Sequence, residues 1–437
     1  MLTALAYTMV IVFMALIMTK RLSALVALML VPIVFGLIGG FGKELGPMML
    51  TGVKNLAPTG VMLTFAILYF SIMIDAGLFD PVVRKITQLV HGDPMKIVVG
   101  TTVLAMIISL DGDGATCYIL TVTAMLPLYK RLGMSRLVLA CVIMLAGGVF
   151  NILPWGGPTA RAASALGVDP RDVFVPMIPA MIVAVIWVLF VSYLLGMKER
   201  RRLGVIDLKA SEAALGGEEI SATKPELARP KLLWVNFALT IALMAMLMLG
   251  VLPLPVMFMI FFAIAVMINY PKLSEQKERI AAHAENVLPV VSLIFAAGIF
   301  VGILSGTKMV DAIAASVIAV IPDWMGPYLA VITGLLSIPF TFFISNDAFY
   351  FGIVPILAKA AAIYGISPAE LARASITGQP VHLLSPLVAS TYLLVGLAEV
   401  EFGDHQRYTL LWSITASLVM LAAAVVFGVV PLVGHAP

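Results

Sequence analysis

The stretch "IISLDGDGATCYIL", residues 107–120, places two aspartates and two glycines between apolar runs. A charged side chain at the centre of a bilayer costs roughly 2.5–3.5 kcal/mol on insertion scales, so acids at that depth are usually functional. Glycine lets the chain reverse, and the freed carbonyl groups are tolerated only against protein or a water-filled cavity. We therefore expect a re-entrant helical hairpin whose Asp111 and Asp113 line a cavity. Its tip comprises Ser109, Gly112, Gly114 and Thr116.

The composition places this stretch in a membrane protein. Of the 437 residues, 61% are hydrophobic and 12% charged, and the mean hydropathy is +1.07, beyond the range of soluble domains. Several apolar runs approach the roughly 20 residues that a helix needs to cross a bilayer. We expect an all-α polytopic membrane protein. The first run precedes Lys20 and Arg21, the reverse of a signal peptide, so it is interpreted as a retained helix.

The chain divides into two similar halves, residues 1–197 and 232–437, joined by a polar linker over 198–231. "KNLAPTGVMLTFAILYF" (54–70) in the first half resembles "ENVLPVVSLIFAAGIF" (285–300) in the second. Each is followed by a short amphipathic segment, an interrupted apolar stretch and then a second interruption. We expect about five transmembrane helices, one re-entrant hairpin and one broken helix in each half. An odd number of crossings makes the two repeats inverted.

Basic residues give the expected orientation. Most Lys and Arg of the loops, including the run "KERRR" at 198–202, fall on the same side as the linker under this topology. Cytoplasmic loops carry the excess of Lys and Arg. The sequence therefore predicts a cytoplasmic linker with both termini outside.

Inverted repeats with broken helices are typical of secondary transporters, where half-helix ends and unwound backbone form the substrate and ion sites. The tip of the second hairpin is expected in "FISNDAFYF" (343–351), which supplies Ser345, Asn346 and Asp347. Hard cations such as Mg2+ and Ca2+ prefer oxygen ligands of this kind. Asp111, Asp113 and Asp347 are therefore candidates for metal or proton coupling. Alternatively, the first two aspartates only cap the second arm of their hairpin at Thr116, or lie in a water-exposed loop.

The second interruption of each half supplies further polar groups. Arg161 suits a carboxylate, or else reaches toward the outer interface. His382 can titrate near neutral pH, or else is a hydrogen-bonded packing residue. Trp155 and Phe349 are expected to be cavity walls, and the role of Asp75 is open. The candidate substrate-binding residues are Asn151, Gly156, Gly157, Thr159, Arg161, Ser345, Asn346, Gln379, His382 and Ser385.

Long stretches of the chain resemble one transporter family. They are "FMALIMTKRLSAL" (13–25), "SLDGDGAT" (109–116), "NILPWGGPTARA" (151–162), "FFISNDAFYFG" (342–352) and "GQPVHLLSPL" (378–387). The pattern resembles the citrate–metal:proton symporter family, within the ion-transporter superfamily that includes the sodium-coupled dicarboxylate carriers. Those carriers have Ser-Asn-Thr at both hairpin tips, whereas this chain has Asp-Gly-Asp-Gly at the first tip and Ser-Asn-Asp at the second.

The resemblance implies uptake of citrate complexed with a divalent metal, Mg2+ or Ca2+, in symport with protons. It also implies an elevator-like movement in a homodimer, located in the cytoplasmic membrane of the cell. The metal would be part of the transported complex, with no permanently bound cofactor, no enzymatic activity and no nucleic-acid partner.

Two other functions remain open. One is a sodium- or proton-coupled di- or tricarboxylate carrier without a metal requirement. The other, more remote, is an intramembrane aspartyl protease, whose two acids must face each other and share a proton. Asp111 and Asp113 lie on one turn instead. A channel is disfavoured because paired broken helices are typical of carriers.

Overall fold

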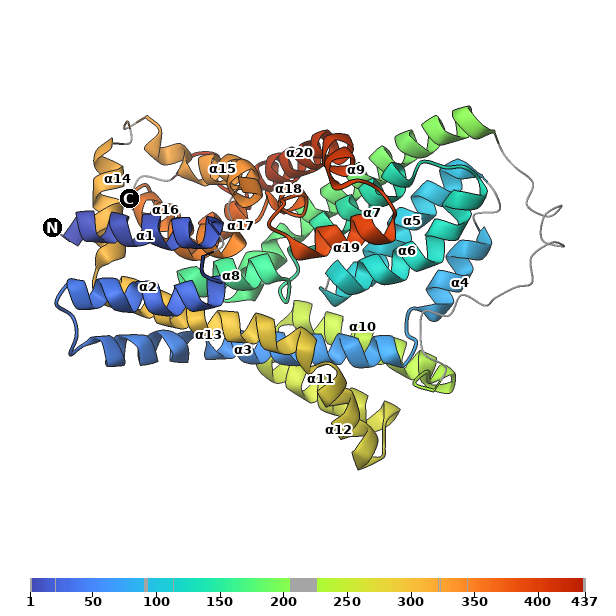
Figure 1. The fold of residues 1–437 in the computed structure, drawn as a ribbon, viewed down its shortest axis with the longest axis horizontal. Coiled ribbons are helices and arrows are strands. Elements are labelled where there is room, and N and C mark those ends of the chain that lie inside the picture. Colours follow the sequence, from blue (N-terminus) through green and yellow to red (C-terminus); the bar gives the residue numbers. More distant parts are fainter. Residues whose placement is uncertain are drawn as a thin grey trace.

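The structure, a computed structural model, is built from helices (Figure 1). It describes residues 2–19, 21–89, 93–112, 114–204, 226–320, 322, 324–343 and 345–434. Within these ranges there is no β-strand. Seven of the described helices are long and apolar enough to cross a membrane, and shorter apolar helices accompany them. The predicted all-α, multi-pass membrane class is confirmed.

The first half begins with three apolar helices and ends with a 34-residue helix. Its hairpin is formed by α5 and α6, and its broken helix by α7 and α8. The elements are α1 (Leu2–Met18), α2 (Ala24–Ile38), α3 (Leu45–Asp75), α4 (Asp80–Leu89), α5 (Pro94–Ile108), the 3-10 turn η1 (Ser109–Asp111), α6 (Gly114–Arg131), α7 (Arg136–Phe150), α8 (Gly157–Leu166) and α9 (Pro170–Leu203).

The second half also contains a hairpin, formed by α15 and α16, and a helix broken into the short pieces α17, α18 and α19. After the 3-10 turn η4 (Pro230–Leu232) come α10 (Leu233–Leu249), α11 (Leu254–Asn269), α12 (Leu273–Ala282), α13 (Ala284–Gly306), α14 (Met309–Val320), η5 (Gly326–Tyr328), α15 (Leu329–Phe343), the π-helix η6 (Ala348–Ile353), α16 (Val354–Ala362), α17 (Pro368–Ser375), α18 (Gln379–His382), α19 (Ala389–Leu397) and α20 (Phe402–Val426). Figure 1 shows α3 and α13 side by side and running in opposite directions.

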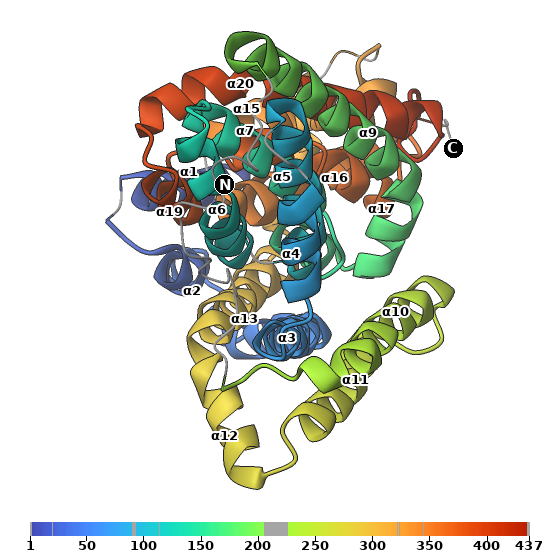
Figure 2. The same ribbon diagram turned by 90° about the vertical axis from the view of Figure 1, so that its right-hand side faces the viewer.

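The helices form two bodies, which are seen separately in Figure 2. The panel consists of α2, α3 and α10–α13. The core bundle consists of α5–α9 and α15–α20, with both hairpins and both broken helices. The bodies touch mainly where α8, η1 and η6 of the bundle meet α3 and α13 of the panel. The remaining helices connect the two bodies: α1 packs on α2 and η6, α14 packs on α13 and α16, and α4 packs on α5.

Close glycine contacts unite α3 and α13 within the panel. A Cβ atom at Gly52 would lie 1.9 Å from the carbonyl oxygen of Gly298, and one at Gly302 would lie 2.3 Å from that of Met48. Small residues at this spacing let membrane helices approach until their backbones touch. The panel is therefore built around a contact that admits no larger side chain.

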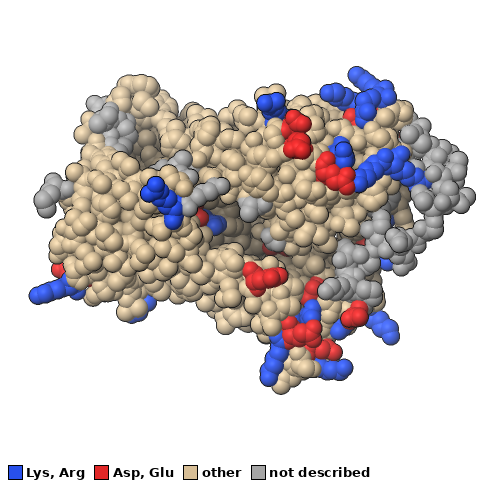
Figure 3. Space-filling view, in the orientation of Figure 1, with Lys and Arg blue, Asp and Glu red and all other residues tan. Residues whose placement is uncertain are grey.

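One end of the molecule carries the linker and most of the visible charge (Figure 3). At this linker end α9 continues to Leu203, so the predicted linker begins as helix, and residues 205–225 lie outside the described ranges. The opposite, terminus end holds both chain ends (Figure 1). The surface between the ends is largely uncharged in Figure 3, as a membrane-embedded belt requires.

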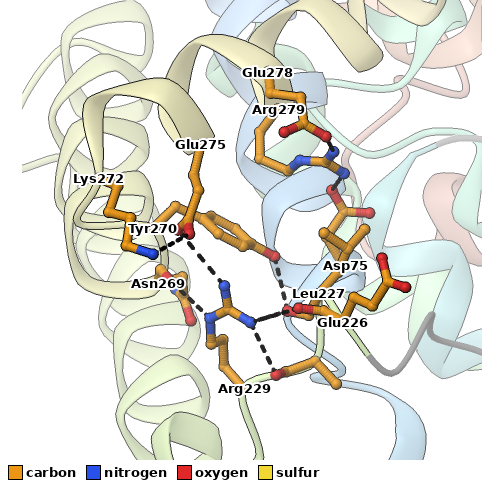
Figure 4. A network of polar contacts seen from close by, with 11 residues as sticks. Asp75, Glu226, Leu227, Arg229, Asn269, Tyr270, Lys272, Glu275, Glu278 and Arg279 are labelled. Carbon is orange, nitrogen blue, oxygen red and sulfur yellow. Dashed lines mark hydrogen bonds and ion pairs between the residues drawn. The ribbon is translucent and has the colours of Figure 1, made fainter.

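A polar network at the linker end assigns a role to Asp75 (Figure 4). Its carboxylate lies 2.7 Å from His283 Nε2 and 3.4 Å from Arg279 Nη1. Arg229, at the end of the linker, lies over the Tyr270 ring at 4.7 Å, and its backbone N–H donates to Ala76 O over 2.9 Å. Asp75 is thus a helix-end residue that fixes α3 to α12.

Candidate binding site

The first hairpin reverses at Gly112, as predicted, because this residue adopts a left-handed φ of +79°. Trp155, from the break between α7 and α8, holds the tip. Its Nε1 donates to Leu110 O over 3.0 Å, and a Cβ at Gly112 would lie 2.7 Å from Trp155 Cδ1. The ring also packs on Phe70 and Phe258 of the panel. Trp155 was expected to be a cavity wall; here it packs between the tip and the panel and is not among the residues that line the cavity beside the tip.

Of the two acids predicted at this tip, the structure describes only Asp111. Asp111 lies in η1 and is 4% exposed, whereas Asp113 lies outside the described ranges. Ser109 Oγ donates to Cys117 Sγ over 3.1 Å, and Thr116 lies in the first turn of α6.

A cavity of about 100 Å³ separates the first tip from both helix breaks. Its polar lining comes from Ser109, Tyr118, Asn151 and Ser390, and its other lining residues are Gly112, Gly114, Gly147, Phe150 and Leu383. Asp111 is buried next to this lining without being part of it. The cavity is smaller than the roughly 300–1,000 Å³ typical of ligand pockets, so the tip and the breaks lie close together in this conformation.

The second tip is followed directly by the π-helix η6. Ser345 Oγ accepts from the backbone N–H of Ala348 over 3.2 Å, which starts the second arm. π-Helical turns occur frequently at functional sites. This one includes Tyr350, a residue that the sequence analysis missed.

A chain of side-chain hydrogen bonds connects both breaks to the second tip. Asn151 Nδ2 donates to Gln379 Oε1 over 2.9 Å. Gln379 Nε2 in turn donates to Tyr350 OH over 2.8 Å and to Asn346 Oδ1 over 3.4 Å, and the Tyr350 hydroxyl donates to Ser375 O over 3.3 Å. Three predicted substrate residues, from two halves of the sequence, therefore form one cluster of amides.

Arg161 and Asp347 form an ion pair beside this cluster. Arg161 Nε lies 2.6 Å from Asp347 Oδ1, and the side chains are 17% and 13% exposed. Arg161 is on α8 and Asp347 is at the second tip, so the pair joins the two halves. Because Arg161 points to a carboxylate within the bundle, it is not extended toward an outer interface.

Several predicted substrate residues donate side-chain hydrogen bonds to backbone carbonyl groups and so stabilise the helix breaks. His382 Nδ1 donates to Thr341 O over 2.7 Å, Ser385 Oγ to Phe342 O over 2.6 Å, and Thr159 Oγ1 to Ile152 O over 2.6 Å. These bonds satisfy carbonyl groups in the last turn of α15 and in the first break, where no further helical turn follows to pair with them. His382, Ser385 and Thr159 are thus engaged with backbone in this conformation.

The glycines of the first break permit its sharp turn. A Cβ at Gly156 would lie 2.3 Å from Asn151 O, and one at Gly157 would lie 2.5 Å from Arg161 Nη1.

The described residues contain no group of three or more His, Cys, Asp or Glu side chains placed to hold a metal ion.

Sequence comparisons agree on one family. A family model described as "Citrate transporter" matches residues 13–378. A "Citrate transporter" of Bacillus subtilis (strain 168) is 61% identical over 98% of this chain and 100% of that protein. A "Mg(2+)/citrate complex secondary transporter" of the same strain is 53% identical over 98% of this chain and 99% of that protein.

Solved structures show the same fold at low sequence identity. The YdaH transporter of Alcanivorax borkumensis, described as having an unusual topology, aligns with a TM-score of 0.62 at 16% identity over 90% of each chain. MtrF of Neisseria gonorrhoeae aligns with a TM-score of 0.60 at 15% identity, over 91% of this chain and 87% of MtrF.

Proposed function

This chain belongs to the citrate transporter family, and from that premise we propose that it takes up citrate complexed with a divalent metal ion, in symport with protons. The family consists of membrane transporters and not of enzymes. The proposal of metal–citrate uptake with protons is supported by the cluster of amides and charges where two hairpin tips and two helix breaks meet. Secondary transporters bind substrates at such places.

The charges of this site favour a complex over bare citrate. Asp111 and Asp347 are carboxylates, and like charges repel strongly where the effective dielectric constant is low. A divalent cation of the Mg2+ or Ca2+ class cancels two negative charges of citrate and prefers oxygen ligands. The relative that is 53% identical is named for a Mg2+/citrate complex.

Two groups of residues divide the work in this proposal. The cationic side of the complex faces Asp111, Asp113 and Asp347. The free carboxylates of citrate face Arg161 and the amides of Asn151, Asn346 and Gln379. These amides hydrogen-bond to one another in the present conformation. Because an amide nitrogen carries two hydrogens, Asn151 can donate the second to a citrate carboxylate while it keeps its bond to Gln379.

We also propose an elevator-type movement of the core bundle against the panel, because direct contacts between these bodies run mainly through α8, η1 and η6, and α1 and α14 connect the two. The repeats 1–197 and 232–437 would be inverted, with a cytoplasmic linker. A homodimer in the cell membrane would hold the panel still while the bundle moves.

Uptake of labelled citrate into proteoliposomes tests the proposal. Mg2+, Ca2+, Zn2+ or EDTA is supplied outside, with and without a pH gradient that is acidic outside. We expect uptake that requires one of the metals and is accelerated by the gradient. Equal uptake in EDTA would favour a metal-independent carrier, and uptake insensitive to the gradient would exclude proton symport.

The acids of the first tip give a sharper form of this test. Asp111→Asn and Asp113→Asn keep the side-chain shape and remove the charge. We expect each variant to insert normally and to lose metal- or pH-dependent uptake. Transport with unchanged dependence on metal and pH, in both single variants and in the double variant, would show that the two acids are only structural caps.

A further inference from the structure

A second polar system lies inside the core bundle on α20. His405, Thr409, Ser413 and Ser417 follow one another at intervals of four residues and therefore share one face of the helix. All four side chains are fully buried. Successive members are about 6 Å apart along the axis, so the set extends over about 18 Å. We call these four residues the α20 column.

Three polar atoms of the α20 column have no hydrogen-bond partner among the described residues: His405 Nε2, Ser413 Oγ and Ser417 Oγ. About 90% or more of buried polar groups in proteins are paired with protein or ordered water. Leaving one unpaired is costly, because the group has lost its hydrogen bonds to water and gained none in the protein. Three such atoms on one helix face give the column free hydrogen-bonding capacity, which a file of water molecules would use.

The α20 column starts near the linker end and runs along the second helix break, whose Leu384 O accepts from Gln406 Nε2 of α20 over 2.7 Å. Thr409 is hydrogen-bonded to Cys141 of α7. Seven residues further along α7, a Cβ at Gly148 would lie 2.6 Å from Pro380 Cα in α18. Ser413 and Ser417 lie one and two turns beyond Thr409 in the same direction. Because α18 packs on both α7 and α20, the end of the column at Ser417 reaches the level of the break.

Several titratable groups lie near the end of the α20 column that is closer to the linker end of the molecule. Tyr129 of α6, Cys141 of α7, Glu199 of α9 and Tyr408 of α20 interact electrostatically. The Glu199 carboxylate accepts from Ser135 N over 2.9 Å and from Arg202 Nη2 over 2.6 Å. Of the other helices against α20, α18 contributes His382, α19 contributes Tyr392, and α15 contains no titratable residue.

We propose that the α20 column is a proton path, in which water molecules beside Ser413 and Ser417 exchange protons with His405 between the break at α18 and the linker end. This path deepens the proton symport proposed above and rests on it. Histidine is suited to the step because its ring has two nitrogens, so one can accept a proton while the other releases one. His405 Nδ1 lies 3.2 Å from Thr409 Oγ1. A proton passed to Nδ1 through Thr409 is balanced by release of the Nε2 proton to water, which restores a neutral ring.

Two assays on the same proteoliposomes test the path. Citrate exchange, with metal and citrate on both sides, returns each bound proton with its substrate and needs no release. Net uptake under a pH gradient, followed with an internal pH dye, needs release in every cycle. We expect Ser413→Ala, Ser417→Ala and His405→Gln to keep exchange within about twofold and to slow net uptake and proton flux about tenfold. Thr415→Ala is the control, since Thr415 lies on α20 but bonds to Trp187 instead.

The possible outcomes distinguish a failure of the proton path from a failure of the proposed transport function. Net uptake that falls no more than exchange in all three variants overturns the path alone. Wild-type exchange without proton flux overturns both the path and proton symport, and absence of citrate exchange overturns the transport proposal. Ser413→Cys and Ser417→Cys, which keep volume and a polar hydrogen, should restore part of the flux. If the alanine variants do not fold, the cysteine variants and His405→Gln decide the matter by the same ratio.

Discussion

Replacing Asp347 with asparagine should relax the preference for metal-bound citrate. Asp347 Oδ1 lies 2.6 Å from Arg161 Nε, and both side chains are mostly buried. The substitution keeps a hydrogen-bond acceptor and removes one negative charge beside the amide cluster. Arg161 is then a free cation that a citrate carboxylate can pair with.

The expected size follows from Coulomb's law. Fully ionised citrate carries two more negative charges than its complex with a divalent cation. At an effective dielectric constant of about 20, each unit charge about 8 Å away contributes roughly 2 kcal/mol. Partial solvent exposure reduces the combined effect to about 2 kcal/mol. The affinity ratio of metal complex to bare citrate should therefore fall at least about tenfold, which corresponds to about 1.4 kcal/mol.

Calorimetric titration of the purified protein, with citrate in Mg2+ and citrate in EDTA, measures this ratio. Glu399→Gln is the matched control, because Glu399 is paired with Lys130 at 2.5 Å and Arg136 at 2.6 Å but is about half exposed at the linker end. The hydrogen bond from Lys130 lowers the pKa of the Glu399 carboxyl, so the control also removes a negative charge. An Asp347→Asn ratio within twofold of the wild type would refute the reasoning. Weaker folding would not mimic the effect, since both ligands are titrated into the same folded fraction.

Other predictions concern packing, binding and orientation. Gly52→Leu should abolish folding because its Cβ would meet a backbone oxygen of α13 at 1.9 Å, whereas Gly46→Leu on the same helix has no atom within 4 Å of its Cβ; thermal stability in detergent compares them, and equal stability would contradict the contact. Asn346→Ala should weaken citrate binding about fivefold, the value of one hydrogen bond near 1 kcal/mol, and unchanged affinity in titration would place the site elsewhere. Cysteines at Ser211 and Gly434 should be labelled from opposite sides, and labelling from one side would exclude inverted repeats.

The breaks in the helices could be predicted from the sequence because glycine, proline and intramembrane acids mark them locally. Gly112 turns the first hairpin as its position in "SLDGDGAT" indicates. The second tip lies between α15 and the π-helix, where Ser345 and Asn346 were expected. Such signals depend on the backbone alone, so no partner from the rest of the chain is needed to recognise them.

The pairing of the site residues could not be predicted, because it joins segments far apart in the sequence. Asn151 and Gln379 are 228 residues apart, and Arg161 and Asp347 are 186 residues apart. Only the packing of the two halves shows that Arg161 is held by a carboxylate. Tyr350 was missed because the π-helix that includes it has no local signal beyond the aromatic run that ends at Gly352.

The central claim is that citrate and a metal ion cross the membrane together. It is tested most directly by measuring citrate and metal in the same washed proteoliposomes after uptake with Mg2+, Ca2+ or Zn2+. Scintillation counting measures the labelled citrate, and elemental mass spectrometry measures the metal. We expect equal molar amounts of citrate and of at least one of these metals in the vesicles, and neither of them when EDTA is added outside. Citrate that accumulates without any metal in the vesicles would contradict it.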